Sequence, residues 1–538
     1  MKNFLPAFIL LILLSNCQEA EKELSPPVIA PFSDVDTLAT NDWWNRTENP
    51  IINLKVDRDS VVAFGLYTVS NATLKISAQL YPLYPDESRD VRLAIEEEND
   101  WREIQTAKVN DLGWSALFRV NNWDNGADVK YQLRHGENAF FEGTIRKEPT
   151  DKDEIVLAAL SCNSNKDRGM RENYVRNINH QDPDLIFFAG DQSYDHTEHT
   201  AAWLKFGLQF RETFRHRPAI TIPDDHDIGQ GNLWGENGKL STAIGSWDGG
   251  YRYHPEYVNM VERCQTAHLP DPFDPSPIAQ NIGVYYTNLD LGGIDFAIIE
   301  DRKFKSGPEG KIPQQGPRPD HISDPDYDPL SIDLPELTLL GDRQLKFLEE
   351  WGSQNEGNMK VVLSQTGFCG GAHIHGSLNN RLHADLDSNG WPQTGRIKAL
   401  NLMKSANAVH IAGDQHLATV IQHGIEEFRD GPWAFVVPAI VNDYYSRWWW
   451  PEGEEAGPNP NKDTQLPWTG DYLDGFNNKI SMMAYVNPES NSKGGGYGLI
   501  RFNTKQKKVT FECWPRYVDV TRADAEQFEG WPFTISLD

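Results

Sequence analysis

Residues 155–163 read IVLAALSCN, so that six apolar residues lead directly into Ser161-Cys162-Asn163. An apolar run without polar alternation is typical of a strand that is covered on both faces. Residues 185–189 form a second run of this kind, and Gly190-Asp191 follows it. Further apolar runs lie at residues 219–222, 296–299, 360–363 and 409–412. The chain therefore contains buried strands, and several of them end in polar side chains.

Helix-like segments separate these runs. They lie at residues 170–179, 200–213 and 342–352. Strands that alternate with helices indicate a layered α/β domain, in which sheets are flanked by helices. We place this domain at residues 149–538. Residues 482–520 return to a strand-like pattern and could complete a second sheet of the same domain.

Residues 51–148 have a different hydrophobic pattern. Short runs, several with period-two alternation, are separated by turn signals such as Tyr84-Pro85-Asp86. This spacing predicts an all-β sandwich of about 100 residues, which we interpret as a supporting or binding module. The expected strands lie at residues 61–69, 73–80, 91–95, 116–120, 129–133 and 140–145.

The N-terminus has the features of an export signal. A basic Lys2 precedes the apolar residues 4–14, which are too few to span about 30 Å of hydrocarbon. Leu14-Ser15-Asn16-Cys17 resembles a bacterial lipobox, in which cleavage leaves Cys17 as the lipid-bearing residue. Residues 1–17 would then be a signal peptide and residues 18–50 a tether. We expect an exported bacterial lipoprotein in the periplasm or at the outer-membrane or cell surface, held by its lipid anchor alone. The alternative is a soluble secreted protein in which Cys17 is incidental.

Composition narrows the classes of partner. The chain has 538 residues, 39% of them hydrophobic, which is an ordinary globular composition. Its formal net charge is −28, so its field repels a phosphate backbone, and we expect no binding to nucleic-acid polymers. An anionic substrate must instead be attracted locally, by metal ions or by a few cationic side chains.

The four remaining cysteines are Cys162, Cys264, Cys369 and Cys513, and none forms a Cys-x-x-Cys pair. An exported protein could join them in disulfides. Four cysteines in a chain of this length cannot form a disulfide scaffold, so the fold must depend on its own hydrophobic core.

The polar residues that follow the apolar runs are of the types that bind metals. Ser161-Cys162, Gly190-Asp191 with Tyr194, Asp224-Asp225-His226-Asp227 and Gly413-Asp414-Gln415-His416 each follow one run. Ligands gather at the carboxyl ends of strands in open α/β sheets, so we expect these four segments to converge. Their carboxylates, imidazoles, thiolate and phenolate exceed what one ion needs. Two ions with a shared carboxylate would use them, an arrangement that activates a water and clamps a phosphoryl group.

These segments, in this order and together with Leu339-Leu340-Gly341-Asp342, resemble the PhoD-type alkaline phosphatases of the calcineurin-like metallophosphoesterase superfamily. The resemblance extends from about residue 52 to the end of the chain. It implies an N-terminal immunoglobulin-like domain before the catalytic domain. It also implies hydrolysis of a phosphomonoester or phosphodiester by a metal-activated hydroxide.

The resemblance assigns roles to individual residues. Cys162 and Tyr194 would bind Fe3+, and Asp191 would bridge it to Ca2+. Asp225 would be a further ligand, and Asp414 and His416 would complete the two coordination shells. The resemblance makes His226 the substrate-facing imidazole that hydrogen-bonds the phosphate. Asn232 could contact the phosphate.

Several residues keep open roles. The loop at residues 364–375 offers three alternatives for a further ligand, Gln365, His373 and His375, and a fourth alternative is that it supplies none. His196 could bind substrate or lie on the surface. Arg447 could pair with an anion beside Trp448-Trp449-Trp450, whose rings could stack on a sugar or base or anchor the loop.

Two other functions remain possible from the sequence. One is a surface lipoprotein that binds glycans and keeps a structural metal site. The other is a hydrolase that acts on another anionic carbohydrate ester, sulfated or phosphorylated. The leading hypothesis is a two-metal phosphoesterase of the cell envelope, with a phosphoester substrate that could be carried on a carbohydrate.

Overall fold

The structure is a computed structural model of the whole chain. It describes residues 32, 34–40, 43, 48–243, 245–375, 382–441, 446–448, 466–487 and 490–537, and the side chains of residues 373–375, 446 and 491 are left out of the description. Residues 1–17, including Cys17, and Trp449 and Trp450 therefore lie outside the described residues. Among the described residues, no helix has both the length and the apolar character needed to span a bilayer.

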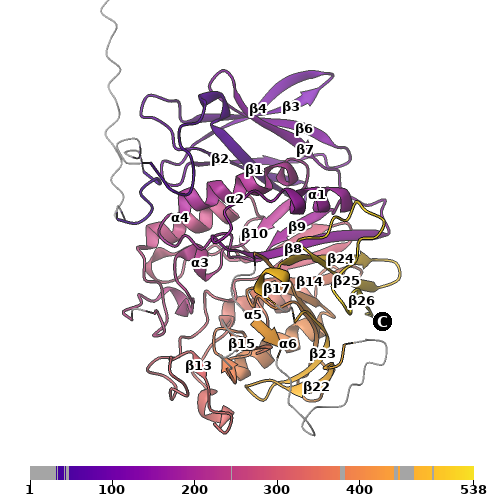
Figure 1. The fold of residues 1–538 in the computed structure, drawn as a ribbon. Helices are drawn as coiled ribbons and strands as arrows, with labels where there is room; N and C mark the ends of the chain where they lie inside the picture. The colour runs from indigo at the N-terminus through magenta and orange to yellow at the C-terminus, as the bar shows by residue number, and fades with distance from the viewer. Residues whose placement is uncertain are drawn as a thin grey trace, which may run out of the picture.

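Two antiparallel sheets form the N-terminal part of the described chain (Figure 1). One has the strand order β1-β2-β5 and the other has the order β4-β3-β6-β7. Apolar side chains from both sheets, such as Tyr67 of β1 and Tyr131 of β6, are buried in one core. The strands are β1 (Val62–Ser70), β2 (Thr73–Leu80), β3 (Asp90–Glu97), β4 (Asp100–Lys108), β5 (Ser115–Asn121), β6 (Val129–His135) and β7 (Ala139–Ile145). Sequence analysis missed β4, because its side chains are polar and mostly exposed.

Two larger sheets form the rest of the fold. The first has the order β10-β9-β8-β24-β25-β26, with β20 paired to β8, and the second has the order β11-β12-β14-β17-β19-β18-β23-β22. The strands of the first sheet are β8 (Glu154–Asn163), β9 (Leu185–Phe188), β10 (Ala219–Thr221), β20 (Ala439–Val441), β24 (Gly496–Asn503), β25 (Lys508–Pro515) and β26 (Phe533–Ser536). Those of the second are β11 (Thr287–Leu291), β12 (Ile294–Ile298), β14 (Met359–Thr366), β17 (Val409–Gly413), β18 (Thr419–His423), β19 (Trp433–Val436), β22 (Gly470–Leu473) and β23 (Lys479–Tyr485).

These two sheets pack face to face. Leu157 of β8 shares an apolar cluster with Leu363 of β14 and Ile411 of β17. The strands β8, β9 and β10 run parallel to one another, as do β12, β14, β17 and β19. The ends of β8 and β17 lie close together. A Cβ added at Gly413 of β17 would lie only 2.2 Å from Ser161 Oγ of β8. Glycine at position 413 thus permits the close approach that brings the two strand ends together.

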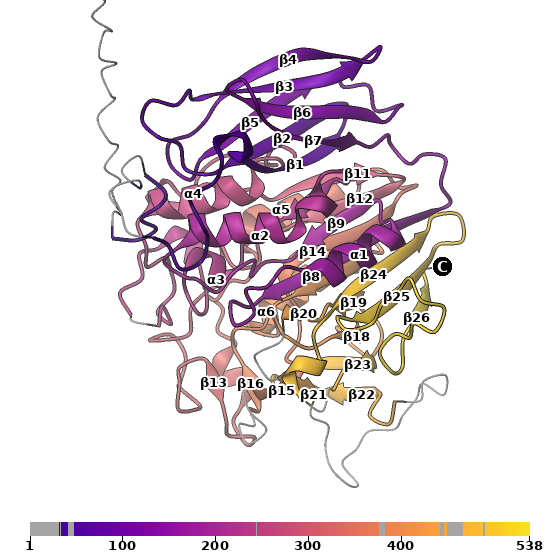
Figure 2. The same ribbon diagram turned by 45° about the horizontal axis from the view of Figure 1, so that its top comes forward.

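Helices cover the outer faces of the sheets (Figure 2). The helix α2 lies between the N-terminal sheets and the β8 sheet, where Trp203 contacts Phe64 and Phe206 contacts Phe188. Leu348 of α5 and Leu400 of α6 share a cluster with Val362 of β14. The helices are α1 (Glu172–Gln181), α2 (His199–Phe214), α3 (Asp225–Ile228), α4 (Pro255–Thr266), α5 (Gly341–Gly352) and α6 (Gln393–Ser405).

Two small ribbons complete the fold near the carboxyl ends of the strands. They pair β13 (His321–Ile322) with β16 (Ala384–Asp385), and β15 (Ala372–His375) with β21 (Ser446–Trp448). The four cysteines at positions 162, 264, 369 and 513 are buried and free, so no disulfide joins them. The division of the chain at residues 148 and 149 into two domains stays a prediction.

Candidate metal centre

The four polar segments converge at one edge of the stacked sheets. Cys162 stands at the end of β8, Asp191 follows β9, Asp225 begins α3 after β10, and Asp414 follows β17. The backbone φ angle is 57° at Cys162, 57° at Asp191 and 67° at Asp414, which places all three in the left-handed region. Such conformations cost energy for residues with a side chain and tend to cluster at functional sites. The chain therefore turns sharply at the residues that sequence analysis selected.

Three groups of potential metal ligands overlap at Asp191. In one group, the ligand atoms of Cys162, Asp191 and His416 lie within 4.8 Å of one another. In a second, those of Asp191, Asp224, Asp225 and Asp414 do so within the same limit, and in a third, those of Asp191, Asp225 and His226 do so. A carboxylate shared by two ligand groups is the arrangement that a pair of bridged metal ions requires.

Tyr194 lies at the first of these groups. Its phenol oxygen is 2.9 Å from His416 Nε2, and its ring centroid is 4.1 Å from that of His226. Burial, followed by the charges of Asp191 and Cys162, raises the pKa of Tyr194 well above its usual range. Tyr194 thus joins Cys162, Asp191 and His416 in a set of sulfur, oxygen and nitrogen donors.

The carboxylates in this cluster outnumber the one cationic side chain, Arg302, that is seen to pair with them. Arg302, only 2% exposed, contacts Asp224 at 2.7 Å, Asp387 at 2.6 Å and Asp414 at 3.1 Å. Burial and neighbouring carboxylates raise the pKa of Asp191 and of Asp225 well above their usual range. Asp191 Oδ1 is buried and accepts no hydrogen bond from the described residues.

These observations test whether the residues fit metal ions. Charged carboxylates buried beside one another are unfavourable unless cations offset them. Thiolate, phenolate and imidazole suit a transition metal, whereas a set of carboxylates suits a hard cation. The donor set therefore fits two metal ions with Asp191 between them.

The segment Asp224-Asp225-His226-Asp227 uses its carboxylates for different tasks. Asp224 caps α3 and pairs with Arg302. Asp227 accepts hydrogen bonds from the backbone N–H groups of Asp191, Gln192 and Asp224 at 2.8, 3.0 and 3.0 Å. Asp227 thus fixes the backbone that presents Asp191. The capping pattern of this segment could have indicated these structural roles from sequence.

His226 is held by a second imidazole. Its Nδ1 shares a hydrogen bond with His196 Nε2, so His196 lies at the site. Burial, together with His196 and His416, lowers the pKa of His226 well below its usual range. A neutral imidazole offers one N–H donor and one acceptor, so the bond to His196 decides which nitrogen of His226 can donate to a ligand.

Other residues that support the ligands were given no role of their own from the sequence. Thr366 Oγ1 and Gln415 Nε2 both donate hydrogen bonds to Asp414 Oδ2. Ser161 Oγ accepts a hydrogen bond from Asp414 N at 3.1 Å and lies 3.1 Å from Cys162 Sγ. Hydrogen bonds of this kind orient metal ligands. Arg302 belongs to no motif, Gln415 lies inside the motif of Asp414 and His416, and only the folded chain shows how these residues contact the carboxylates.

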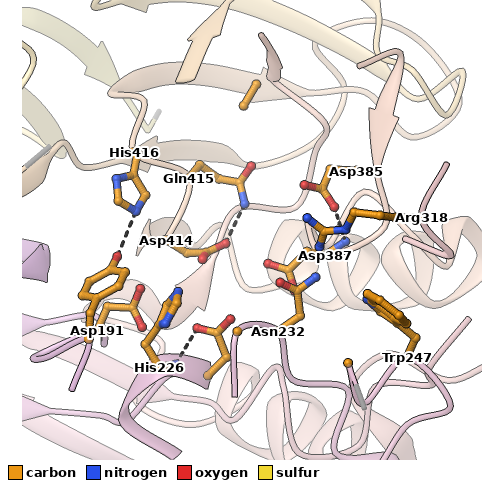
Figure 3. A pocket seen from close by; sticks show the side chains of 15 residues that line it. Asp191, His226, Asn232, Trp247, Arg318, Asp385, Asp387, Asp414, Gln415 and His416 are labelled. Carbon is orange, nitrogen blue, oxygen red and sulfur yellow. Dashed lines mark hydrogen bonds between the residues drawn. The ribbon is translucent and has the colours of Figure 1, made fainter. Parts of the chain in front are cut away.

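A cavity of about 410 Å³ opens over the cluster (Figure 3). Asp191, His226 and Asp414 line it, and Asn232 lines it too, as the sequence suggested. Asn232 Nδ2 donates a hydrogen bond to Asp320 Oδ2 at 2.7 Å. Its predicted contact with phosphate stays a prediction.

The residues with open roles lie in different surroundings. Gln365 is buried, and its amide bonds the backbone N–H of Asp301 and the hydroxyl of Tyr285. Arg447 lies on β21 opposite Ile374, and it is not among the described residues that line the cavity. Its predicted pairing with an anion stays untested. The side chains of His373 and His375 lie outside the description.

Trp448 is the one residue of the segment Trp448-Trp449-Trp450 whose surroundings the structure describes. It is 1% exposed, and its indole N–H donates a hydrogen bond to Trp468 O at 3.0 Å. Trp448 therefore anchors its strand in the core, as in the anchoring interpretation, and its ring does not line a surface groove.

A further acidic group lies nearby. The ligand atoms of Asp320, His321 and Asp385 are within 4.8 Å of one another. Asp320, however, already accepts hydrogen bonds from Arg318 Nη2 at 2.6 Å and from Asn232 at 2.7 Å. Asp320 thus has protein donors, whereas Asp191 has an oxygen that no donor in the described part of the chain reaches.

Comparison with solved structures shows which fold this is. The structure of PhoD matches with a TM-score of 0.63 and 14% identity, over 90% of this chain and 92% of that one. The chain has the fold of PhoD. The structure of the purple acid phosphatase PPD1 from yellow lupin seeds matches with a TM-score of 0.52 and 12% identity, over 88% of this chain and 73% of that one. No protein-family model and no curated protein matches the chain.

The PhoD fold confirms two predictions. The predicted resemblance is confirmed for the fold, and so is the fold class of an α/β layered domain with an N-terminal all-β part. The identities are low, so these structures speak for the fold alone. The activity must be argued from the site.

Proposed function

We propose that the chain is a metal-dependent phosphoric ester hydrolase. The observation that carries the proposal is Asp191, which belongs to three overlapping groups of potential metal ligands at the cavity that His226 lines. The PhoD fold supports it, since PhoD and the lupin purple acid phosphatase share this architecture. Two ions at this position would supply the positive charge that polarises a phosphoryl group and activates a water.

The protein residues divide the work between holding the ions and handling the substrate. Cys162, Tyr194 and His416 would hold the first ion with Asp191, and Asp225 and Asp414 would hold the second with it. The thiolate and phenolate favour Fe3+ at the first position, and the carboxylates favour Ca2+ at the second. His226 would donate a hydrogen bond to the phosphoryl or leaving oxygen, with its orientation fixed by His196.

The cellular setting is part of the same proposal. The export signal and Cys17 support a lipid-anchored protein of the bacterial cell envelope. The net charge of −28 supports a small phosphoester rather than a nucleic-acid polymer as the substrate. Phosphomonoesters and phosphodiesters both remain candidates.

The test combines metal analysis with hydrolysis. Protein lacking residues 1–17 is analysed for metals by mass spectrometry and assayed on p-nitrophenyl phosphate and its bis ester. Asp191→Asn should lose both bound metal and turnover. Asp295→Asn is the matched control and should retain both bound metal and turnover. Asp295 is equally buried, but it lies on β12 and pairs with Lys360 at 2.8 Å. A wild-type protein without turnover after iron and calcium are restored would refute the proposal.

A further inference from the structure

The cavity has a second end that the metal ligands do not occupy. In Figure 3, Asp191 and His416 stand on one side, and Trp247 and Arg318 stand on the opposite side. The volume of about 410 Å³ exceeds the space that a phosphoryl group fills. The far end is therefore where the organic part of a phosphoester would lie.

Trp247 gives this end an apolar surface. Its ring is partly exposed and packs closely on Gly245, where an added Cβ would lie 2.5 Å from the ring. The Arg318 guanidinium lies 5.9 Å from the ring centroid. Both neighbours also line the cavity, so the indole is held in place at its wall. A fixed aromatic ring beside a polar group suits a ligand that is apolar on one face and polar at its edge.

The charged side chains at this end are already engaged with one another. Arg318 contacts Asp320 at 2.6 Å, and Asp387 contacts Arg302 at 2.6 Å. Asp385 adds another carboxylate to the lining. Pairing with Asp320 offsets the charge of Arg318, so this end is poorly suited to a second phosphate. Its carboxylates can instead accept hydrogen bonds from hydroxyl groups, and Arg318 can donate to them.

We propose that the organic part of the substrate is one neutral sugar ring, with its apolar face on Trp247 and its hydroxyls on Asp385, Asp387 and Arg318. The inference rests on the proposed phosphoesterase activity and names its substrate class. Hydroxyls both donate and accept, so vicinal hydroxyls match a wall that offers carboxylate acceptors beside a guanidinium donor.

Phosphate release from four esters at equal concentration tests the proposal. The esters are ethyl phosphate, glucose 6-phosphate, glucose 1,6-bisphosphate and adenosine monophosphate. Wild-type kcat/KM for glucose 6-phosphate should exceed that for each of the others by about tenfold or more, as expected for stacking with added hydrogen bonds. Trp247→Leu should remove this preference over ethyl phosphate while ethyl phosphate turnover stays within about threefold.

Trp101→Leu is the matched control. Trp101 is also partly exposed beneath a guanidinium, with Arg134 at 5.5 Å from its ring centroid, but it lies on β4 far from the cavity lining. This variant should keep the wild-type preference. The wild-type ranking tests the proposal even if Trp247→Leu does not fold.

The outcomes separate the two proposals. Equal turnover of ethyl phosphate and glucose 6-phosphate, or a preference for the bisphosphate or the nucleotide, would overturn the sugar inference and leave the phosphoesterase standing. A preference that survives in Trp247→Leu would also overturn it. Absence of turnover on every ester, and on p-nitrophenyl phosphate and its bis ester, would remove the phosphoesterase proposal, and the sugar inference with it.

Discussion

Two groups of largely buried acidic residues lie beside one cavity, and they differ in how their charge is balanced. In the group of Asp191, Asp224, Asp225 and Asp414, Arg302 pairs with Asp224 and Asp414 and also with Asp387, and Asp191 keeps a buried oxygen without a donor among the described residues. In the group of Asp320, His321 and Asp385, by contrast, Asp320 is bonded by both Arg318 and Asn232.

The difference teaches that proximity of ligands does not by itself make a metal site. Both groups bring their ligand atoms within the same 4.8 Å. What separates Asp320 from Asp191 is whether protein cations and N–H donors already satisfy the carboxylate, since burial makes unpaired charge expensive. We therefore assign the metals to the first group, and the following variants test that assignment.

The largest effect is expected at the second ion. Asp225→Ala should lose one of two bound ions and lower kcat on the order of 10³-fold, because a ligand and its charge are removed. Asp385→Ala, in the other group, should retain both ions. Metal stoichiometry by mass spectrometry and initial rates measure this. Loss of an ion in Asp385→Ala would break the comparison.

The two groups also differ in their histidines. His226→Ala should lower kcat by roughly 10²-fold, within the range for loss of a positioned proton donor. His321→Ala should keep kcat within about threefold, although His321 is also buried. Rates on p-nitrophenyl phosphate, with metal content as a check, measure the difference. Equal losses in the two variants would place both groups in the reaction.

Arg302 tests the charge balance of the first group. Arg302→Met should destabilise the chelator-treated protein by about 3 to 5 kcal/mol, because buried carboxylates lose their cation. Added metal should recover part of the loss in thermal midpoint. Arg396→Met is the control, since Arg396 is also fully buried but bonds the carbonyl oxygens of Phe368 and Gly424. Its loss should not respond to metal, and a response there would undermine the interpretation.

The smallest effect is expected at Arg318, whose side chain is 42% exposed. Arg318→Met should cost about 1 kcal/mol, as for a partly exposed ion pair, and should leave the metal stoichiometry unchanged. Arg343→Met is the control, because Arg343 pairs with Asp274 at 2.7 Å outside the cavity lining. Uptake of an additional ion by Arg318→Met alone would show that Arg318 suppresses a metal site.

Both kinds of sheet were predicted in part, since β4 of the N-terminal sheets and β11, β18, β19, β20, β22 and β26 of the larger sheets were not predicted. The continuous apolar runs predicted β8, β9, β10, β12, β14 and β17 within a few residues, because strands covered on both faces exclude polar side chains. The edge strand β4 was missed, since its exposed polar residues carry no burial signal. The helices α4 and α6 were not predicted either, although Pro255 marks the start of α4.

The sequence by itself determined which residues stand at the ends of the buried strands, and hence which donor atoms a metal could meet. Chain connectivity and burial fix these positions, so motif spacing is enough to find Cys162, Asp191, Asp225 and Asp414. Only the tertiary structure decided that Arg302 shares its charge among three carboxylates and that Trp247 faces the ligands across the cavity. These residues come from loops distant in sequence, and such contacts depend on how the sheets pack rather than on any local pattern.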